Sequence, residues 1–186
     1  GVFYGKQVRN AAIDALSRLD MAGIVEYGHA TGVDWTHPLA ELGDKSAIKQ
    51  AINNLVFGDM PDFAPSLNVA LGGLQRVNAG QKHVIMISDG DPSMPSQSLL
   101  QKYRESKVSI SCVSVFPHSG WDTGRMRDIA KDTGGEYYEV NTQAALATLP
   151  QIFIKEAQTV RRSLIWEGTP FVPREIGRAH RLNSSH

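Results

Sequence analysis

The sequence predicts an α/β fold in which a mainly parallel central sheet is flanked by helices on both faces. Two observations lead to this prediction. Short apolar runs typical of strands alternate with helical patterns of about ten to fifteen residues, the order expected of βαβ units. Residues 84–87 are apolar without interruption, as in a parallel strand covered on both faces. The 186 residues, 41% of them hydrophobic, suffice for one such domain.

The first half of the chain predicts helices around two strands. Apolar residues from Val8 to Leu19 recur at helical spacing and form one stripe. A proline is expected to end the second strand, because it cannot donate a ladder hydrogen bond. In order, we expect a helix over 6–19, a buried strand over 22–27, an edge strand from Thr31 to Pro38, a helix from an N-cap at Asp44 to Leu55, a loop over 58–65 and a helix over 66–77.

The second half predicts a regular alternation of strands and helices. In order, we expect a strand over 84–87, a turn over 88–92, a helix over 96–106, a strand over 108–116, a helix over 123–133 that Gly134 and Gly135 end, a strand over 136–140, a helix over 150–158 and an extended exit segment over 160–166. We assign residues 1–159 to one domain and 160–174 to a linker. Residues 175–186 resemble the translation of a sequencing-adapter oligonucleotide and are set apart from the fold.

Composition excludes several classes of function. Lys and Arg together number 19, as do Asp and Glu, so the chain has no basic excess for nucleic acid. No stretch of 18 apolar residues occurs, so we expect no membrane contact by this segment. Cys112 is the one cysteine, within an apolar strand, and is expected to be a buried small side chain. The sequence has no Gly-rich phosphate loop, Cys–His pairing or nucleophile elbow.

Candidate chemistry gathers where the strands of an open α/β sheet end. Three loops follow such ends, and their side chains are expected to converge: Gly28 and His29, Asp89 and Asp91, His118 and Asp122. The carboxylates of Asp89 and Asp91 are oxygen ligands that suit Mg²⁺ or Ca²⁺. The simpler alternative, favoured on spacing alone, is that Asp89 caps the next helix while Gly90 supplies a special backbone angle.

Two runs carry a resemblance to a known family. Residues 82–92 resemble the hallmark strand and loop of von Willebrand factor A-type domains, and residues 123–138 resemble the helix that ends in a Thr-Gly-Gly turn and feeds a strand. Residues 22–27 are similar to the family's second strand, and residues 65–71 to the helix after its metal loop. The resemblance covers about residues 6–154. It implies a central first strand that is missing here, because the chain opens just before the first helix.

The resemblance also implies a metal-ion-dependent adhesion site. The family builds it from an Asp-x-Ser-x-Ser loop after the first strand, a threonine and a later aspartate, whose place Asp89 occupies. The first loop is missing from this chain, and no threonine stands near Pro61, where Asp59 or Asp62 is the available oxygen donor. We therefore expect a degenerate site with Asp89 and Asp62 as candidate ligands. An intact parent domain would bind Mg²⁺ or Ca²⁺. For this chain alone we assign no cofactor.

The resemblance implies a non-catalytic protein–protein interaction module of a larger bacterial, membrane-associated protein, on the extracytoplasmic side, with an unidentified protein partner. The alternative is a Mg²⁺-dependent phosphatase or hydrolase that uses Asp89 and Asp91. Such chemistry also needs a basic side chain that neutralises the phosphoryl group. The nearest ones are not well placed, because Lys82 begins its strand at the opposite end from the site and Lys102 lies well along a helix. The three tryptophans, Trp35, Trp121 and Trp166, are predicted to be packing anchors. His118 and Trp121 are weaker candidates for a docking surface.

Overall fold

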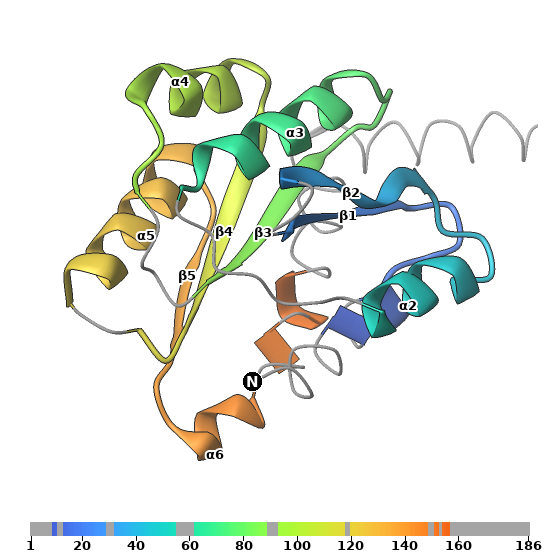
Figure 1. The fold of residues 1–186 in the computed structure, drawn as a ribbon. Coiled ribbons are helices and arrows are strands. Elements are labelled where there is room, and N and C mark those ends of the chain that lie inside the picture. Colours follow the sequence, from blue (N-terminus) through green and yellow to red (C-terminus); the bar gives the residue numbers. More distant parts are fainter. Residues whose placement is uncertain are drawn as a thin grey trace, which may run out of the picture.

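The structure is a computed structural model that describes residues 9–10, 13–28, 32–54, 62–88, 93–117, 120–148, 151–152 and 154–156. Figure 1 shows the elements in chain order: β1 (Met21–Gly28), β2 (Gly32–Glu41), α2 (Ser46–Asn53), α3 (Ala64–Gln75), β3 (Lys82–Ser88), α4 (Gln97–Glu105), β4 (Val108–Val115), α5 (Gly120–Thr133), β5 (Tyr137–Val140) and α6 (Gln143–Leu146). Residues 9–10 and 13–15 form an N-terminal helical segment, and residues 151–152 and 154–156 form a C-terminal one.

The described strands form two sheets. β1 and β2 are an antiparallel pair, whereas β3, β4 and β5 form a parallel sheet in that order. The parallel register pairs Ser88 with Ser114 and Val115 with Val140. The carboxyl ends of these three strands therefore lie at one edge, which we call the carboxyl edge. The predicted α/β class with a mainly parallel sheet is confirmed.

Helices cover both faces of the parallel sheet. On one face, Val84, Met86 and the alternate residues of β4 pack into the main core with α3, α4 and α5. The opposite face carries Ile85 and Ile87, which share a cluster around Val113 and Val140 with Ile152 of the C-terminal helical segment. Figure 1 shows this segment on the side of the sheet away from α4 and α5. This two-sided cover explains why residues 84–87 are apolar without interruption.

The Thr-Gly-Gly turn ties α5 to β4. The buried Thr133 hydroxyl accepts a hydrogen bond from the Ile110 N–H at 3.0 Å and donates to the Ile129 carbonyl at 2.8 Å. Gly134 has φ +81°, which favours glycine, and the Gly135 N–H closes the helix on the Ala130 carbonyl at 2.9 Å. A Cβ on Gly135 would lie 2.0 Å from the Ile110 carbonyl oxygen. The sequence of the turn therefore follows from close backbone contact.

The N-terminal helical segment ends earlier than predicted. Residues 16–20 are not helical, and Leu19, expected on the apolar stripe, is 81% exposed. The Asp20 carboxylate accepts a hydrogen bond from the Ser17 N–H at 2.7 Å and so stabilises a turn in place of another helical turn. Residues 6–8 lie outside the described residues.

Two expected boundaries in the first half are wrong. Pro38 does not end its strand, because β2 continues to Glu41. A register shift between Ala22 and Ile24 lies opposite the proline and accommodates its missing N–H. Asp44 does not occupy the N-cap of α2, where Lys45 stands with φ 67°; the Asp44 carboxylate instead accepts from the Ser46 N–H at 3.1 Å.

The expected helix starts in the second half also shift. Ser96 caps α4, since its hydroxyl accepts from the Leu99 N–H at 3.2 Å, so the alternative that Asp89 caps this helix is wrong. α3 begins at Ala64, two residues before the predicted start, with Pro65 in its first turn. The short helix α6 was not predicted.

Two packing predictions are confirmed. The Trp35 ring packs closely on two glycines. A Cβ on Gly23 of β1 would lie 2.6 Å from the ring, and a Cβ on Gly73 of α3 would lie 2.4 Å from it. Cys112 is fully buried, and burial raises the pKa of its thiol to about 12. Trp35 therefore joins the hairpin to α3, and Cys112 fills the main core.

Candidate functional site

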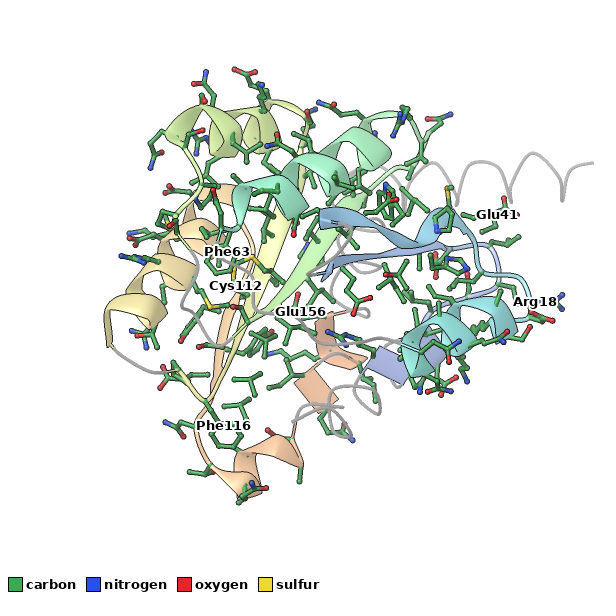
Figure 2. All side chains as sticks on the ribbon, in the orientation of Figure 1. Arg18, Glu41, Phe63, Cys112, Phe116 and Glu156 are labelled. Atoms are coloured by element: carbon green, nitrogen blue, oxygen red, sulfur yellow. The ribbon has the colours of Figure 1, made fainter. Side chains whose placement is uncertain are left out.

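The carboxyl edge presents an aromatic side chain directly after β4. Phe116 is 38% exposed and has φ +52°. Its N–H donates to the Val140 carbonyl at 2.8 Å, which holds this backbone conformation in place. Figure 2 shows Phe116 at the end of β4, away from the main core around Cys112.

The backbone conformation of Phe116 is costly for an aromatic residue. Left-handed φ values outside glycine cost about 1–3 kcal/mol and cluster at functional positions. The two other described non-glycine residues with positive φ, Lys45 and Lys107, lie in turns beside α2 and α4. Phe116 is the one aromatic residue of these three. Burial of its ring would offset the backbone strain, but the ring is partly exposed.

Asp62, the described candidate metal ligand, lies at the start of α3. An isolated parallel bridge pairs it with Ser93, which follows Asp89 by four positions. The fold therefore brings the Asp62 segment beside the chain that leaves the Asp89 loop. One Asp62 carboxylate oxygen accepts from the Ala64 N–H at 2.8 Å. This hydrogen bond forms a turn just before α3, and the second carboxylate oxygen is not part of it.

The other predicted site residues can be placed only in part. Gly28 ends β1, and Asp122 and Trp121 belong to α5, with no side chain described for either of the latter. Outside the described residues lie Asp89, Asp91, Gly90, His29, His118, Asp59, Pro61 and Trp166. Within the described ranges, no three His, Cys, Asp or Glu side chains gather to hold a metal ion. The Asp89–Asp62 site thus stays a prediction.

The basic residues weighed for phosphoryl chemistry do not lie at this edge. Lys82 begins β3, at the amino end of the sheet, and Lys102 lies within α4. In the part of the chain that the structure describes, no helix is long and apolar enough to cross a membrane.

A buried polar cluster lies on the opposite face of the sheet, and sequence reasoning missed it. Glu156 of the C-terminal helical segment is 3% exposed. Its carboxylate accepts from the Ser111 hydroxyl at 2.7 Å, from His83 Nε2 at 3.1 Å and from the Tyr138 hydroxyl. His83 Nδ1 lies 2.6 Å from the Ser109 hydroxyl. We call these five residues the Glu156 cluster; Figure 2 labels Glu156 beside the sheet.

The electrostatics of the cluster favour an ionised carboxylate. Burial raises the pKa of Glu156, but the hydrogen bonds from His83, Tyr138 and Ser111 outweigh it and hold the pKa below its ordinary value. Because a carboxylate only accepts, we assign the proton on the facing ring nitrogen of His83 to Nε2. Burial and the hydrogen bond to Glu156 raise the pKa of the Tyr138 hydroxyl. The cluster therefore fastens the C-terminal helical segment to β3, β4 and β5.

Sequence signals for these features were weak. The partners of Glu156 lie 45 and 73 positions away in Ser111 and His83, beyond the reach of any local pattern. The strain at Phe116 leaves no trace in residue type, since the φ value follows from strand pairing. His83, a polar residue directly before the apolar run 84–87, was the available hint.

Solved structures similar to this chain share its fold. They include a von Willebrand factor type A protein from Catenulispora acidiphila, at 20% identity and a TM-score of 0.69, over 84% of this chain and 37% of that one. An aerotolerance-related membrane protein from Bacteroides fragilis matches at 13% identity and a TM-score of 0.62, over 85% and 88% of the two chains. The SpRpn10 VWA domain matches at 14% and 0.59, over 79% and 80%. The chain thus spans little more than a third of the first of these proteins.

The family comparison agrees with the α/β fold. The model of the von Willebrand factor type A domain matches residues 4–152, well over half of the chain. Domains of this family are commonly protein-interaction modules and are generally not enzymes. The chain belongs to the von Willebrand factor type A domain family.

Proposed function

We propose that this chain is a non-catalytic protein-docking module of a larger, membrane-associated bacterial protein, and that Phe116 anchors the partner at the carboxyl edge. The observation that carries the proposal is a partly exposed aromatic ring held at φ +52°. Strain is retained where the surrounding structure over-determines it, and such positions cluster at functional sites. Aromatic residues, Phe among them, are also enriched in protein interfaces.

The membrane setting is supported by similarity of fold. The Bacteroides fragilis relative is a membrane protein and matches this chain over 88% of its own length. We place the domain on the extracytoplasmic side of such a parent.

We further propose that docking does not depend on a bound cation. The position where the family has a threonine ligand holds no threonine. Asp89 with Asp62 is a reduced ligand set for Mg²⁺, which prefers octahedral oxygen coordination.

Site-specific photo-crosslinking in the natural full-length protein tests the docking surface. Phe116 is replaced by the similarly shaped p-benzoylphenylalanine, and the matched control carries the same residue at Leu19, which is more exposed. In cells that make the protein, irradiation is expected to yield one discrete adduct from position 116, identifiable by mass spectrometry, and none from position 19. Equal adduct patterns at the two positions, or no adduct from 116, would contradict the proposal.

A further inference from the structure

Four basic residues lie at the amino edge of the parallel sheet, at the opposite ends of the strands from Phe116. Arg76 directly follows α3, and Lys82 begins β3. Arg104 lies in the last turn of α4, and Lys107 directly precedes β4. Figure 1 shows β3 and β4 beginning near α4 and ending on the side of α6. We call these four residues the basic corner.

Two contacts bring the elements of the basic corner together. The side-chain amide of Gln75 donates to the Ser106 hydroxyl at 3.1 Å, which joins the end of α3 to the turn between α4 and β4. The parallel register pairs Lys82 with Val108, the first residue after that turn. The turn itself carries Lys107, so the ends of α3 and α4 and the start of β3 meet around one lysine.

The basic corner has no acidic partner in the part of the chain that the structure describes. None of its four side chains forms an ion pair there, and Arg76, Arg104 and Lys107 are exposed. The adjacent acidic residue, Glu105, accepts a hydrogen bond from the Gln101 amide at 2.8 Å. Because basic and acidic residues are equal in number over the whole chain, the basic corner is a local excess of positive charge.

The acidic residues around β5 are set back from the basic corner. β5 pairs with β4 from Cys112 onward, whereas Lys82 pairs with Val108, four positions earlier. At about 3.3 Å per residue, this offset is about 13 Å. Glu136 directly precedes β5, and Asp132 in the last turn of α5 forms no ion pair with the corner among the described contacts. These carboxylates therefore do not neutralise it.

Lys107 occupies a position where glycine is the usual residue. It is the first residue beyond Ser106, the cap of α4, and has φ +54°. Its N–H donates to the Arg104 carbonyl at 3.0 Å, which closes the helix end. Helices commonly end in such a left-handed residue, and glycine adopts this conformation without the penalty of a Cβ. Stability alone therefore does not account for a lysine here.

The helix dipole accounts for only part of the basic corner. A cation near the carboxyl end of a helix is stabilised by the partial negative charge there. This effect applies to Arg76 after α3 and to Arg104 in α4. It does not explain Lys82, which begins a strand, or the use of a strained lysine at position 107 in place of glycine.

We propose that the basic corner binds an acidic segment of a protein partner, a short run of Asp and Glu side chains. Cations without partners attract carboxylates of opposite charge, and each of the two arginines can hold a carboxylate through two parallel hydrogen bonds. A lipid surface fits less well, because segments that bind membrane surfaces combine basic residues with exposed apolar ones. The large apolar side chains exposed among the described residues, Leu19 and Phe116, lie outside the corner.

Fluorescence anisotropy with a defined peptide and the full natural protein tests the inference. The probe is a labelled, capped peptide of about eight alternating Asp and Glu residues, and the control peptide carries Asn and Gln in their place. The acidic peptide should bind saturably, and its Kd should rise with salt because exposed charges are screened. The neutral peptide should not bind.

Matched variants locate the binding surface. Arg76→Gln combined with Lys107→Gln removes two ion pairs with the peptide and should raise Kd about tenfold. Arg18→Gln combined with Lys131→Gln removes the same charge from exposed positions outside the corner and should change Kd less than about twofold. The inference is overturned if the acidic peptide does not bind, or if the two double variants weaken binding equally, because net charge alone would then explain it.

Lys107→Gly separates binding from folding. Glycine relieves the positive φ and removes the charge, so Tm should stay the same or rise while Kd rises about threefold. An unchanged Kd in this variant would contradict the role of Lys107. Binding of phosphatidylglycerol vesicles in place of the peptide, lost in Arg76→Gln with Lys107→Gln, would assign the corner to a membrane surface and overturn the inference. Loss of the Phe116 adduct would leave all these results unaffected.

Discussion

Removing the Glu156 carboxylate should destabilise the domain more than any surface substitution. Glu156→Ala leaves the Ser111 hydroxyl, the Tyr138 hydroxyl and the His83 Nε2–H without their acceptor, and both Ser111 and His83 are largely buried. Leaving a buried donor without its acceptor costs about 1–3 kcal/mol for each group. We therefore expect a loss of about 4 kcal/mol, since the two hydroxyls can turn toward other acceptors.

The assay is thermal and urea unfolding with matched variants. For a domain of this size, 1 kcal/mol shifts Tm by about 2–4 °C, so Glu156→Ala should lower Tm by roughly 8–16 °C. Glu156→Gln keeps the shape and one acceptor and should cost about 1–2 kcal/mol. The control is Glu105→Gln, an exposed position on α4 paired only with Gln101 among the described contacts, with an expected change within about 0.5 kcal/mol.

Acidity should erase the advantage of the native carboxylate over Glu156→Gln. The pKa of Glu156 is lowered in the folded state, so its contribution is complete above the ordinary carboxyl pKa and is lost as pH falls through the lowered value. The stability difference between the two proteins should thus be complete above the ordinary carboxyl pKa of 4.5 and shrink as the pH falls below it. The role given to the cluster would be refuted if the two Glu156 variants were as stable as Glu105→Gln. It would also be refuted if the stability difference between the native protein and Glu156→Gln did not change with pH.

Three further outcomes follow from the geometry. Gly135→Ala forces a Cβ against the Ile110 carbonyl and should lower the free energy of unfolding in urea by about 3 kcal/mol. Gly72→Ala has open space around it inside α3 and should raise that free energy by about 0.5–1 kcal/mol. Equal effects of the two substitutions would contradict this packing. Phe116→Gly relieves a positive φ and should leave Tm unchanged or higher, and a large loss of Tm would show the ring to be structural. Cys112 should react with a thiol reagent only after unfolding, so modification at the rate of an exposed thiol would be inconsistent with its burial.

Sequence reasoning predicted the features that depend on local chemistry. The apolar run 84–87 and the Thr-Gly-Gly turn are local signals, and the structure gives each a direct physical cause. Leu19 was misplaced because the Asp20 side chain competes with the helix for a backbone N–H. Pro38 was misread as a strand end because the register shift opposite it is set by the partner strand.

The candidate site was predictable only in outline. Parallel pairing places the strand ends at one edge, as expected from the alternation of strands and helices. The strained conformation of Phe116 depends on a bond to Val140, and the Glu156 cluster depends on contacts across three strands. Such long-range contacts are fixed by the assembled fold, so no window of sequence contains them.

The central claim, that this module docks a protein without the help of a cation, is tested most directly by the crosslinking yield at position 116 with and without a chelator. The measurement compares the adduct formed in Mg²⁺ with that formed in EDTA, in the same protein and with position 19 as the background. We predict equal yields, because the proposed anchor is the Phe116 ring and the position of the family's threonine ligand holds no threonine. An adduct that disappears in EDTA and returns with Mg²⁺ would contradict this account and restore a working metal site at Asp89 and Asp62.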